Sequence, residues 1–292
     1  MQHRDVLPLG DGPYVLLRDL ILERTGMEFE AGKRELLADK LAELVASLGL
    51  TSFLDYYYLL RYDDAAEEHW SRLMDRLSVP ETYFWRQAEQ FEALANIIAP
   101  AHFAAWSSPL RIWSAACCTG EEPISIAMAL DNVGLLQGKP VIIRGSDGSE
   151  AMVKRARDAT YGERSFRQIP PGFRERYFEA LPNGRWRPLQ RLRDHVHYSV
   201  ANLVRPVEVL PLASADVIYC RNVFIYFSDD MIRRVADSFA RAMPSGGHLF
   251  LGASESLTRL GVGFELKEMG KGFVYVRSAT AERTTATNRG VT

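Results

Sequence analysis

Two adjacent carboxylates stand out in the stretch WSAACCTGEEPISIA, residues 113–127. Glu121 and Glu122 follow an apolar run and Gly120, and they lie at the start of a helix in which Pro123 is expected at the first position. A glycine turn that leads into a helix often binds phosphate, but two acids beside a phosphate would be electrostatically unfavourable. The sequence has neither GxxxxGK(S/T) nor GxGxxG, which excludes a P-loop and leaves no dinucleotide fingerprint. As an alternative to ligand binding, the two acids could stabilise the N-terminus of the helix through its dipole.

Other polar side chains follow three further strand-like runs. Asp147 ends PVIIRGSD, Asn202 lies at the end of DHVHYSVANL, and Asn222 follows ADVIYC. The carboxyl ends of parallel strands form the ligand-binding edge of an open α/β sheet, and an acid that ends the second strand commonly binds ribose hydroxyls. S-adenosylmethionine has a ribose, an ammonium group and a sulfonium but no phosphate, so acids suit its charges. We therefore predict this cofactor, although Asp147 before Gly148 would also suit a turn or a helix cap.

These side chains depend on an alternation of strands and helices that begins near Leu110. The alternation predicts an α/β fold with a doubly wound, mostly parallel, Rossmann-like sheet. A final hairpin around residues 270–272 would add an antiparallel C-terminal edge. Strands are expected within 110–117, 140–147, 194–203, 215–227 and 248–254 and on both sides of the hairpin, and helices are expected within 123–136, 149–162 and 228–243.

The other segments predict how the chain is divided into domains. Residues 1–80 have helical periodicity, with Gly49 placed to end one helix and Thr51 to cap the next, which predicts a small all-helical N-terminal domain. Residues 81–108 are predicted to be a linker and 109–278 the sheet domain. Residues 162–194 are too long for a simple connection and are predicted to hold a small β insertion. The polar tail, 279–292, is predicted to be disordered.

Composition excludes several classes of protein. The 292 residues have a formal net charge of −2, which gives no global attraction to nucleic acid or anionic membranes. The chain has no apolar run of transmembrane length and no signal-peptide core, so we expect a cytoplasmic protein that does not insert into membranes. Its three cysteines suggest neither a disulfide framework nor a metal site. We expect a monomer that binds no nucleic acid and no metal.

Five segments together carry a resemblance to a known family. They are ETYFWR (81–86), SAACCTGEEPISIAMAL (114–130), GSDGS (145–149), the pair Asn202-Leu203 and YCRNVFIYF (219–227). In order and spacing, from about Tyr14 to Arg277, they resemble the CheR-type chemotaxis receptor methyltransferases. The resemblance implies transfer of a methyl group from S-adenosylmethionine to glutamate side chains of methyl-accepting chemotaxis receptors, whose acidic cytoplasmic helices would be the partner. It also implies a receptor-recognition role for the helical domain.

The resemblance implies which residues bind the cofactor. It assigns the ribose to Asp147 and prefers Glu122 over Glu121. The full set that matches the family's pattern is Thr82, Arg86, Glu122, Asp147, Asn202, Leu203, Arg221 and Asn222.

The sequence departs from the family's pattern at a few positions. Pro80 stands where the family usually has asparagine, Gly148-Ser149 stands where it usually has Ile-Asp, and Trp85 replaces a phenylalanine. The change at Pro80 removes one cofactor hydrogen bond. None of the changes removes an ion-pair partner, so we expect weakened or rearranged binding rather than an inactive site.

The expected chemistry needs alignment and no general base. The unperturbed pKa of glutamate is about 4.3, so the acceptor is already an anion at neutral pH. We hypothesise that Arg86 binds a carboxylate and that Tyr226 donates a hydrogen bond to the acceptor, which makes these two the candidate catalytic residues. A structural arginine between two domains and a core tyrosine are the alternatives.

Two other functions remain open from the residues alone. One is a signalling adaptor that binds S-adenosylmethionine but transfers nothing, supported only by Pro80 and Gly148. The other is a nicotinamide-dependent oxidoreductase, which the missing GxGxxG and the acids after the first strand disfavour. For receptor recognition, Lys33, Arg34 and Lys40 are a candidate basic face. The insertion is short, so a receptor tethering peptide is not expected there.

Overall fold

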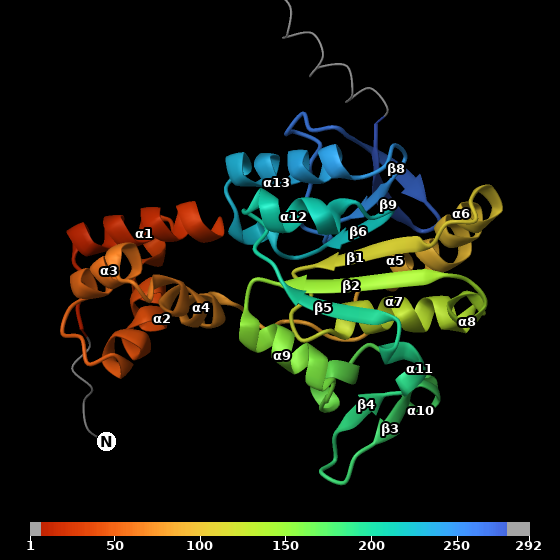
Figure 1. The fold of residues 1–292 in the computed structure, drawn as a ribbon, viewed down its shortest axis with the longest axis horizontal. Helices are drawn as coiled ribbons and strands as arrows, with labels where there is room; N and C mark the ends of the chain where they lie inside the picture. The colour runs from red at the N-terminus through yellow and green to blue at the C-terminus, as the bar shows by residue number, and fades with distance from the viewer. Residues whose placement is uncertain (1–6, 279–292) are drawn as a thin grey trace, which may run out of the picture.

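The computed structural model describes residues 7–278, and the tail predicted to be disordered lies outside them. The first part is a bundle of helices, drawn in red and orange in Figure 1. Its core contains Leu17, Ile21, Leu37, Leu41 and Leu73, all fully buried, because leucines recur at helical spacing on facing helices. The helices are α1 (Asp11–Thr25), α2 (Arg34–Ser47), α3 (Phe53–Tyr62) and α4 (Ala66–Leu77), with a 3-10 turn at Ala31–Lys33.

A helical segment joins this bundle to the sheet. It consists of α5 (Ala88–Ala93), a π-helical stretch (Leu94–Ile98) and α6 (Ala99–Ala105) in direct succession. Phe91 and Leu94 are fully buried in a core cluster that also includes strand residues. The segment therefore packs onto the sheet and does not act as a free linker.

The sheet has seven strands in the order β5-β2-β1-β6-β7-β9-β8. The pairs among β5, β2, β1, β6 and β7 are parallel, and β9 and β8 are antiparallel, which confirms the predicted fold class. The strands are β1 (Leu110–Ala115), β2 (Val141–Asp147), β5 (Val196–Val200), β6 (Val217–Cys220), β7 (His248–Phe250), β8 (Phe264–Met269) and β9 (Gly272–Arg277).

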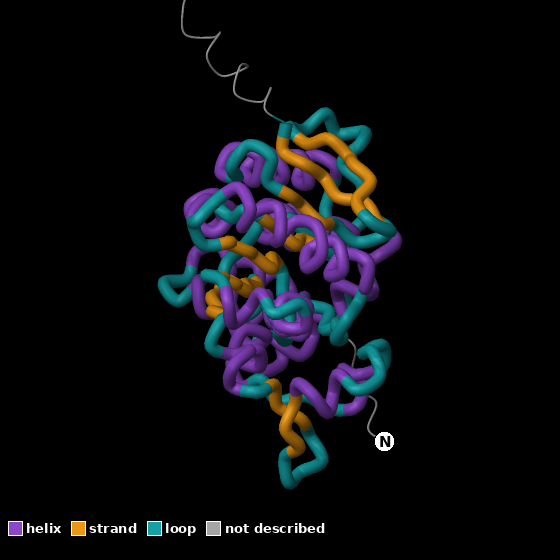
Figure 2. The backbone as a smooth tube through the Cα atoms, turned by 90° about the vertical axis from the view of Figure 1, so that its right-hand side faces the viewer, coloured by secondary structure: helices purple, strands orange, loops and turns teal. Residues whose placement is uncertain are grey.

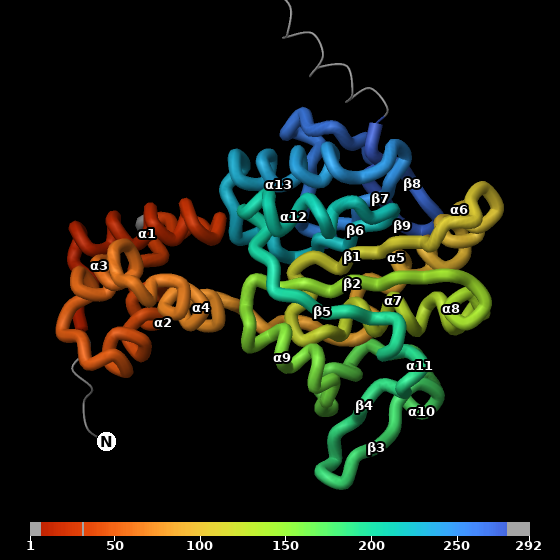
Figure 3. The backbone as a smooth tube through the Cα atoms, viewed as in Figure 1, coloured from red at the N-terminus to blue at the C-terminus, as the bar shows by residue number. Residues whose placement is uncertain are grey.

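Helices cover both faces of the sheet, as the turned view in Figure 2 and the tube in Figure 3 show. One buried cluster joins α5 and α7 to the sheet, and a second joins α12 and α13 to it. The chain moves outward from β1 to β2 and β5 and then returns to β6 on the other side of β1. The carboxyl ends of β1 and β6 are therefore the switch point, where such sheets bind ligands. The helices are α7 (Glu121–Asn132), α8 (Leu135–Gly138), α9 (Glu150–Asp158), α12 (Pro206–Ala213) and α13 (Asp229–Ala242).

The predicted β insertion forms the projection drawn in green at the bottom of Figure 1. Its strands pair antiparallel around a turn at Gly184, and Tyr161 forms a bridge with Trp186 at its base. Its elements are a 3-10 turn (Glu163–Phe166), α10 (Phe173–Tyr177), β3 (Phe178–Ala180), β4 (Trp186–Pro188) and α11 (Gln190–Arg193).

Two local expectations are wrong. The cap of α3 is Ser52, whose hydroxyl accepts a hydrogen bond from Asp55 N, and not Thr51. Helix α7 starts at Glu121, so Pro123 is its third residue and not its first. The candidate basic face for receptor recognition stays a prediction, and one of its cations is engaged within the bundle. Lys40 Nζ donates to the carbonyls of Arg76 and Leu77 at 3.1 and 3.4 Å, because these end α4 without helical partners.

The described residues include no helix that is both long and apolar enough to cross a membrane.

Candidate cofactor-binding site

One cavity lies between the helical bundle and the carboxyl ends of the strands. Its volume is about 950 Å³, including the space at its open side. All nine residues predicted to bind the cofactor or to act in catalysis line it: Thr82, Arg86, Glu122, Asp147, Asn202, Leu203, Arg221, Asn222 and Tyr226. Residues more than a hundred positions apart in the sequence thus meet at the predicted edge of the sheet.

The turn after β1 has an unusual backbone that approaches this cavity closely. Ala116 and Cys118 have positive φ angles of 57° and 51°, and Gly120 has 92°. A Cβ atom on Gly120 would lie 2.8 Å from the Tyr198 hydroxyl and 3.0 Å from the Tyr161 hydroxyl, so no larger residue fits without a shift. Such backbone strain persists only where surrounding contacts hold it, and it is common at ligand sites.

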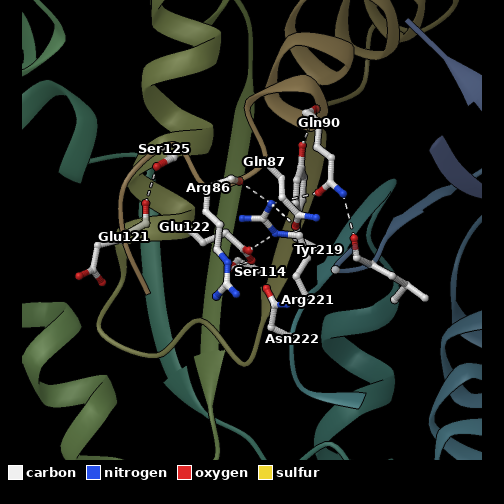
Figure 4. A network of polar contacts seen from close by, with 12 residues as sticks. Arg86, Gln87, Gln90, Ser114, Glu121, Glu122, Ser125, Tyr219, Arg221 and Asn222 are labelled. Carbon is white, nitrogen blue, oxygen red and sulfur yellow. Dashed lines mark hydrogen bonds and ion pairs between the residues drawn. The ribbon is translucent and has the colours of Figure 1, made fainter. Parts of the chain in front are cut away.

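The two adjacent acids point in different directions, as Figure 4 shows. Glu121 is 3% exposed and accepts hydrogen bonds from Thr119 Oγ1 at 2.6 Å and Ser165 Oγ at 2.9 Å. Burial raises the pKa of Glu121, and these hydroxyls partly offset the shift. Glu122 lines the cavity and accepts a hydrogen bond from Ser114 Oγ at 2.7 Å. The structure therefore places the second acid at the candidate site and gives the first a separate polar environment.

Arg221 joins Glu122 to the segment before α5 (Figure 4). Its Nε donates to Glu122 Oε2 at 2.5 Å, and its Nη1 donates to the Arg86 carbonyl at 2.7 Å. The same Nη1 lies 3.2 Å from Gln87 Oε1 and 3.1 Å from Gln90 Oε1. The Arg221 side chain is 3% exposed, so this is a buried ion pair, and neighbouring oxygens also accept from its Nη1 group.

Arg86 is held between two residues with left-handed backbone conformations. Trp85 has φ 66° and Gln87 has φ 61°, and Trp85 N is fixed by a 3.0 Å hydrogen bond to Ser125 Oγ. Arg86 Nη1 donates to the Glu81 carbonyl at 2.9 Å. Among residues 7–278, no carboxylate forms an ion pair with Arg86. The half-buried Arg86 guanidinium therefore borders the cavity and has further N–H groups that a ligand could accept from.

Asp147 is a buried carboxylate without an ion-pair partner in the described part of the chain. Its oxygens accept hydrogen bonds from Cys118 N at 2.9 Å and Ser149 N at 3.0 Å. Burial raises the pKa of Asp147, the backbone N–H groups lower it, and the nearby Asp75 raises it. Each oxygen keeps a free lone pair, so the carboxylate can still accept hydroxyl donors.

Asn202 is occupied by contacts within the protein. Its Nδ2 donates to the Arg24 carbonyl at 2.8 Å, and its Oδ1 accepts from Val204 N at 3.1 Å. Arg24 belongs to α1, so this amide connects the loop after β5 to the helical bundle. Leu203 beside it is buried and supplies an apolar part of the cavity wall.

The loop with Asn222 and Tyr226 is fixed by an acid that sequence reasoning missed. Glu255 accepts backbone hydrogen bonds from Asn222, Phe224 and Gly252 at 2.7, 2.7 and 2.6 Å. Asn222 itself has φ 59°. The sequence did carry a signal for Glu255, because it is one more acid shortly after a strand, in GASES.

The helical bundle contributes directly to the same cavity. Glu28 N donates to the Tyr226 carbonyl at 2.8 Å, and Met27 forms a bridge with Phe227. Burial raises the pKa of the Tyr226 hydroxyl, and Arg86 opposes the shift. Bundle residues on the cavity wall are Thr25, Met27, Met74 and Ser78. Sequence reasoning missed them, because nothing in the periodicity of a helix shows which distant loop it covers.

The polar side chains on the cavity wall fit S-adenosylmethionine. Asp147 offers acceptors for a ribose, Glu122 offers acceptors for an ammonium group, and Arg86 offers donors for a carboxylate. Pro80, the departure expected to cost one cofactor hydrogen bond, borders a neighbouring cavity and is not part of this wall. The residues present therefore suit the ribose, the ammonium group and the carboxylate of the cofactor.

Comparisons with known proteins agree with this geometry. Residues 80–272 match the model for the CheR methyltransferase, SAM binding domain, and residues 14–78 match the CheR methyltransferase, all-alpha domain. Chemotaxis protein methyltransferase 2 of Vibrio cholerae is 32% identical over 269 residues, which cover 91% of this chain and 93% of that protein. The chemotaxis protein methyltransferase of Escherichia coli is 32% identical over 271 residues, covering 91% and 92%. The probable biofilm formation methyltransferase WspC of Pseudomonas putida is 35% identical over 257 residues, covering 87% and 59%.

Proposed function

Because the chain belongs to the CheR methyltransferase family, with S-adenosylmethionine as its cofactor, we propose that it methylates glutamate side chains of methyl-accepting chemotaxis receptors. The products are a glutamate methyl ester and S-adenosylhomocysteine. The observation that carries the proposal is the cavity that combines a buried carboxylate, Asp147, with a guanidinium, Arg86, neither of which forms an ion pair within residues 7–278. Relatives named chemotaxis protein methyltransferases, which align over nine-tenths of the chain, support the same function.

In this proposal the sheet side of the cavity holds the cofactor. Asp147 accepts hydrogen bonds from the ribose hydroxyls, and Glu122 accepts them from the ammonium group. Thr82 and Arg86 bind the cofactor's carboxylate, while Asn222 completes the polar contacts. Leu203 and the backbone near Asn202 border the base. Arg221 positions Glu122 and the Arg86 backbone through the contacts already described.

The transfer step requires alignment of charged groups. S-adenosylmethionine supplies, when bound, an electrophilic methyl group on a sulfonium. The acceptor carboxylate needs no base, since the ordinary pKa of glutamate is about 4.3. Arg86 lies where its guanidinium can orient the cofactor's carboxylate. Tyr226 is protonated at neutral pH, since the ordinary pKa of tyrosine is about 10 and burial raises it further. Tyr226 can then donate a hydrogen bond that holds the acceptor oxygen in line with the methyl group.

The helical bundle is proposed to present the receptor to this site. It covers one side of the cavity and forms backbone hydrogen bonds with the loop that carries Tyr226. A receptor helix bound to the bundle would therefore lie close to the acceptor position. By covering the cavity, the bundle also limits the access of water to the carboxylate that is attacked.

The test is methyl transfer from radiolabelled S-adenosylmethionine to a purified receptor cytoplasmic fragment. Arg86→Ala should lose turnover by at least about a hundredfold while circular dichroism stays unchanged. Arg234→Ala, which removes an exposed arginine from α13 of the sheet domain, is the matched control and should behave like the wild type. An active Arg86→Ala variant would show that the assignment of Arg86 is wrong. A wild type that binds S-adenosylhomocysteine but methylates no receptor would support the adaptor instead.

A second candidate is the same reaction on a receptor that controls biofilm formation. It is favoured by the 35% identity to the probable biofilm formation methyltransferase WspC. Assaying receptor fragments from both kinds of signalling system in parallel would decide between the two, because the chemistry at the site would be identical.

A further inference from the structure

A methionine of the helical bundle lies against the residue that follows the ribose acid. Met74 is near the end of α4, and Gly148 directly follows Asp147 at the end of β2. Both line the cavity. A Cβ atom on Gly148 would lie 2.7 Å from Met74 Cε, and its next neighbour would be the Ala201 carbonyl at 4.0 Å. The methyl end of Met74 therefore occupies the space that a side chain at position 148 would use.

Gly148 is not required by its own backbone. Its φ angle lies outside the left-handed region that favours glycine, so other residues could adopt the same conformation. The contact with Met74 is what limits the size of residue 148.

Helix α4 is fixed against this segment by hydrogen bonds next to Met74. Asp75 Oδ1 accepts from Ser149 Oγ at 2.5 Å and from Ala151 N at 3.1 Å. Ser71 Oγ, one turn earlier in α4, donates to Glu150 Oε2 at 3.3 Å. These bonds join the end of α4 to the N-terminus of α9. They hold Met74 over Gly148 where the helical bundle contacts the sheet domain.

We propose that Met74 is a cofactor-binding residue that the helical bundle supplies to the nucleoside part of S-adenosylmethionine. The inference rests on the proposed placement of the ribose at Asp147. A nucleoside bound there would pass beside Gly148, which offers no side chain, and Met74 provides the apolar contact instead. A thioether suits this role because its polarizable sulfur and methyl group pack favourably against aromatic rings. The departure from the family at position 148 is thus compensated by a residue from another domain.

The experiment is a double-mutant cycle read by calorimetric titration with S-adenosylhomocysteine. Met74→Ala should weaken binding roughly three- to tenfold, because the apolar contact is lost. Gly148→Ala should weaken binding in the wild-type background, because its new methyl group displaces Met74. In the Met74→Ala background, the same substitution should strengthen binding, because its methyl group refills part of the space.

Three comparisons decide the outcome. Met152 also lines the cavity but does not contact Gly148, so the Met152→Ala and Gly148→Ala effects should simply add. If Met74→Ala lowers the melting temperature but leaves the affinity unchanged, Met74 is only a packing residue and the inference is wrong. Equal effects of Gly148→Ala in both backgrounds would also overturn it. Asp147→Asn tests the placement separately: if that variant still binds as the wild type does, the proposed site itself is wrong.

Discussion

The two sides of the cavity are built from different interactions. On the sheet side, buried charged groups are fixed by several hydrogen bonds each, as in the pair of Arg221 and Glu122. On the bundle side, Met27, Met74 and Thr25 present apolar or small polar surface, and the side is attached through backbone contacts such as Glu28 N to the Tyr226 carbonyl. The sheet side thus provides charge recognition, and the bundle side provides cover.

This difference predicts a difference in sensitivity. Removing one partner of a buried charge pair leaves an uncompensated charge, whereas trimming an apolar cover loses only contacts. Changes to the buried charge pair on the sheet side should therefore affect binding and folding together, and changes on the bundle side should weaken binding less.

The largest effect is expected for Arg221→Ala. Glu122 would lose its buried partner and three acceptors near Arg86 would lose their donor, so the free energy of unfolding should fall by about 3–5 kcal/mol. Binding of S-adenosylhomocysteine should be lost with it. Urea unfolding and calorimetry measure the two quantities. Adding Glu122→Gln should restore part of the stability but not the binding, and a single variant as stable as the wild type would contradict the buried-pair description.

Asp147→Asn should separate binding from stability. The affinity for S-adenosylhomocysteine should fall roughly 10- to 100-fold, because two hydrogen bonds to a charged acceptor weaken. Stability without ligand should change little, because removal of the buried charge offsets the loss of the acceptor oxygen for one backbone N–H group. The folded-state pKa of Asp147 is raised, mainly by burial, so the ionised carboxylate opposes folding once the pH exceeds its unfolded pKa. A strongly destabilised variant would show that Asp147 is mainly structural.

An intermediate effect is expected for Glu255→Ala, which removes the carboxylate that fixes the loop of Asn222. Three backbone N–H groups would lose their acceptor, costing about 1–3 kcal/mol of stability. Turnover should fall more than cofactor affinity, because Tyr226 lies on this loop while most cofactor contacts do not. Steady-state kinetics on a receptor fragment would measure both. Glu255→Gln, which keeps one acceptor oxygen, should recover part of the turnover.

The smallest effect is expected for Asp75→Asn on the bundle side. Asp75 raises the pKa of Asp147, so removing its charge should lower that pKa. Since the ribose is proposed to bind the ionised Asp147, affinity for S-adenosylhomocysteine should decline on acidification at a lower pH than in the wild type. A titration series across the acid range would detect it, and a shift toward higher pH would contradict the assigned coupling.

The sequence by itself determined the elements and the edge at which the site forms. Strand and helix alternation, Asp147 at the end of β2 and the Ser149 cap of α9 follow from local periodicity and capping, which nearby residues decide. Polar residues that followed strands were therefore expected together, and the cavity lining agrees.

The family resemblance preferred Glu122 over Glu121, but only the tertiary structure gave the physical reason. Glu121 and Glu122 are indistinguishable in composition, but successive residues of a helix point about 100° apart, so contacts with the insertion and with Arg221 separate them. Met74 gave no local signal, and the position of Glu255 after a strand did not show which loop it holds, because both roles arise from residues far away in the chain. The left-handed conformations of Trp85 and Gln87 likewise depend on long-range hydrogen bonds and packing that outweigh local backbone preference.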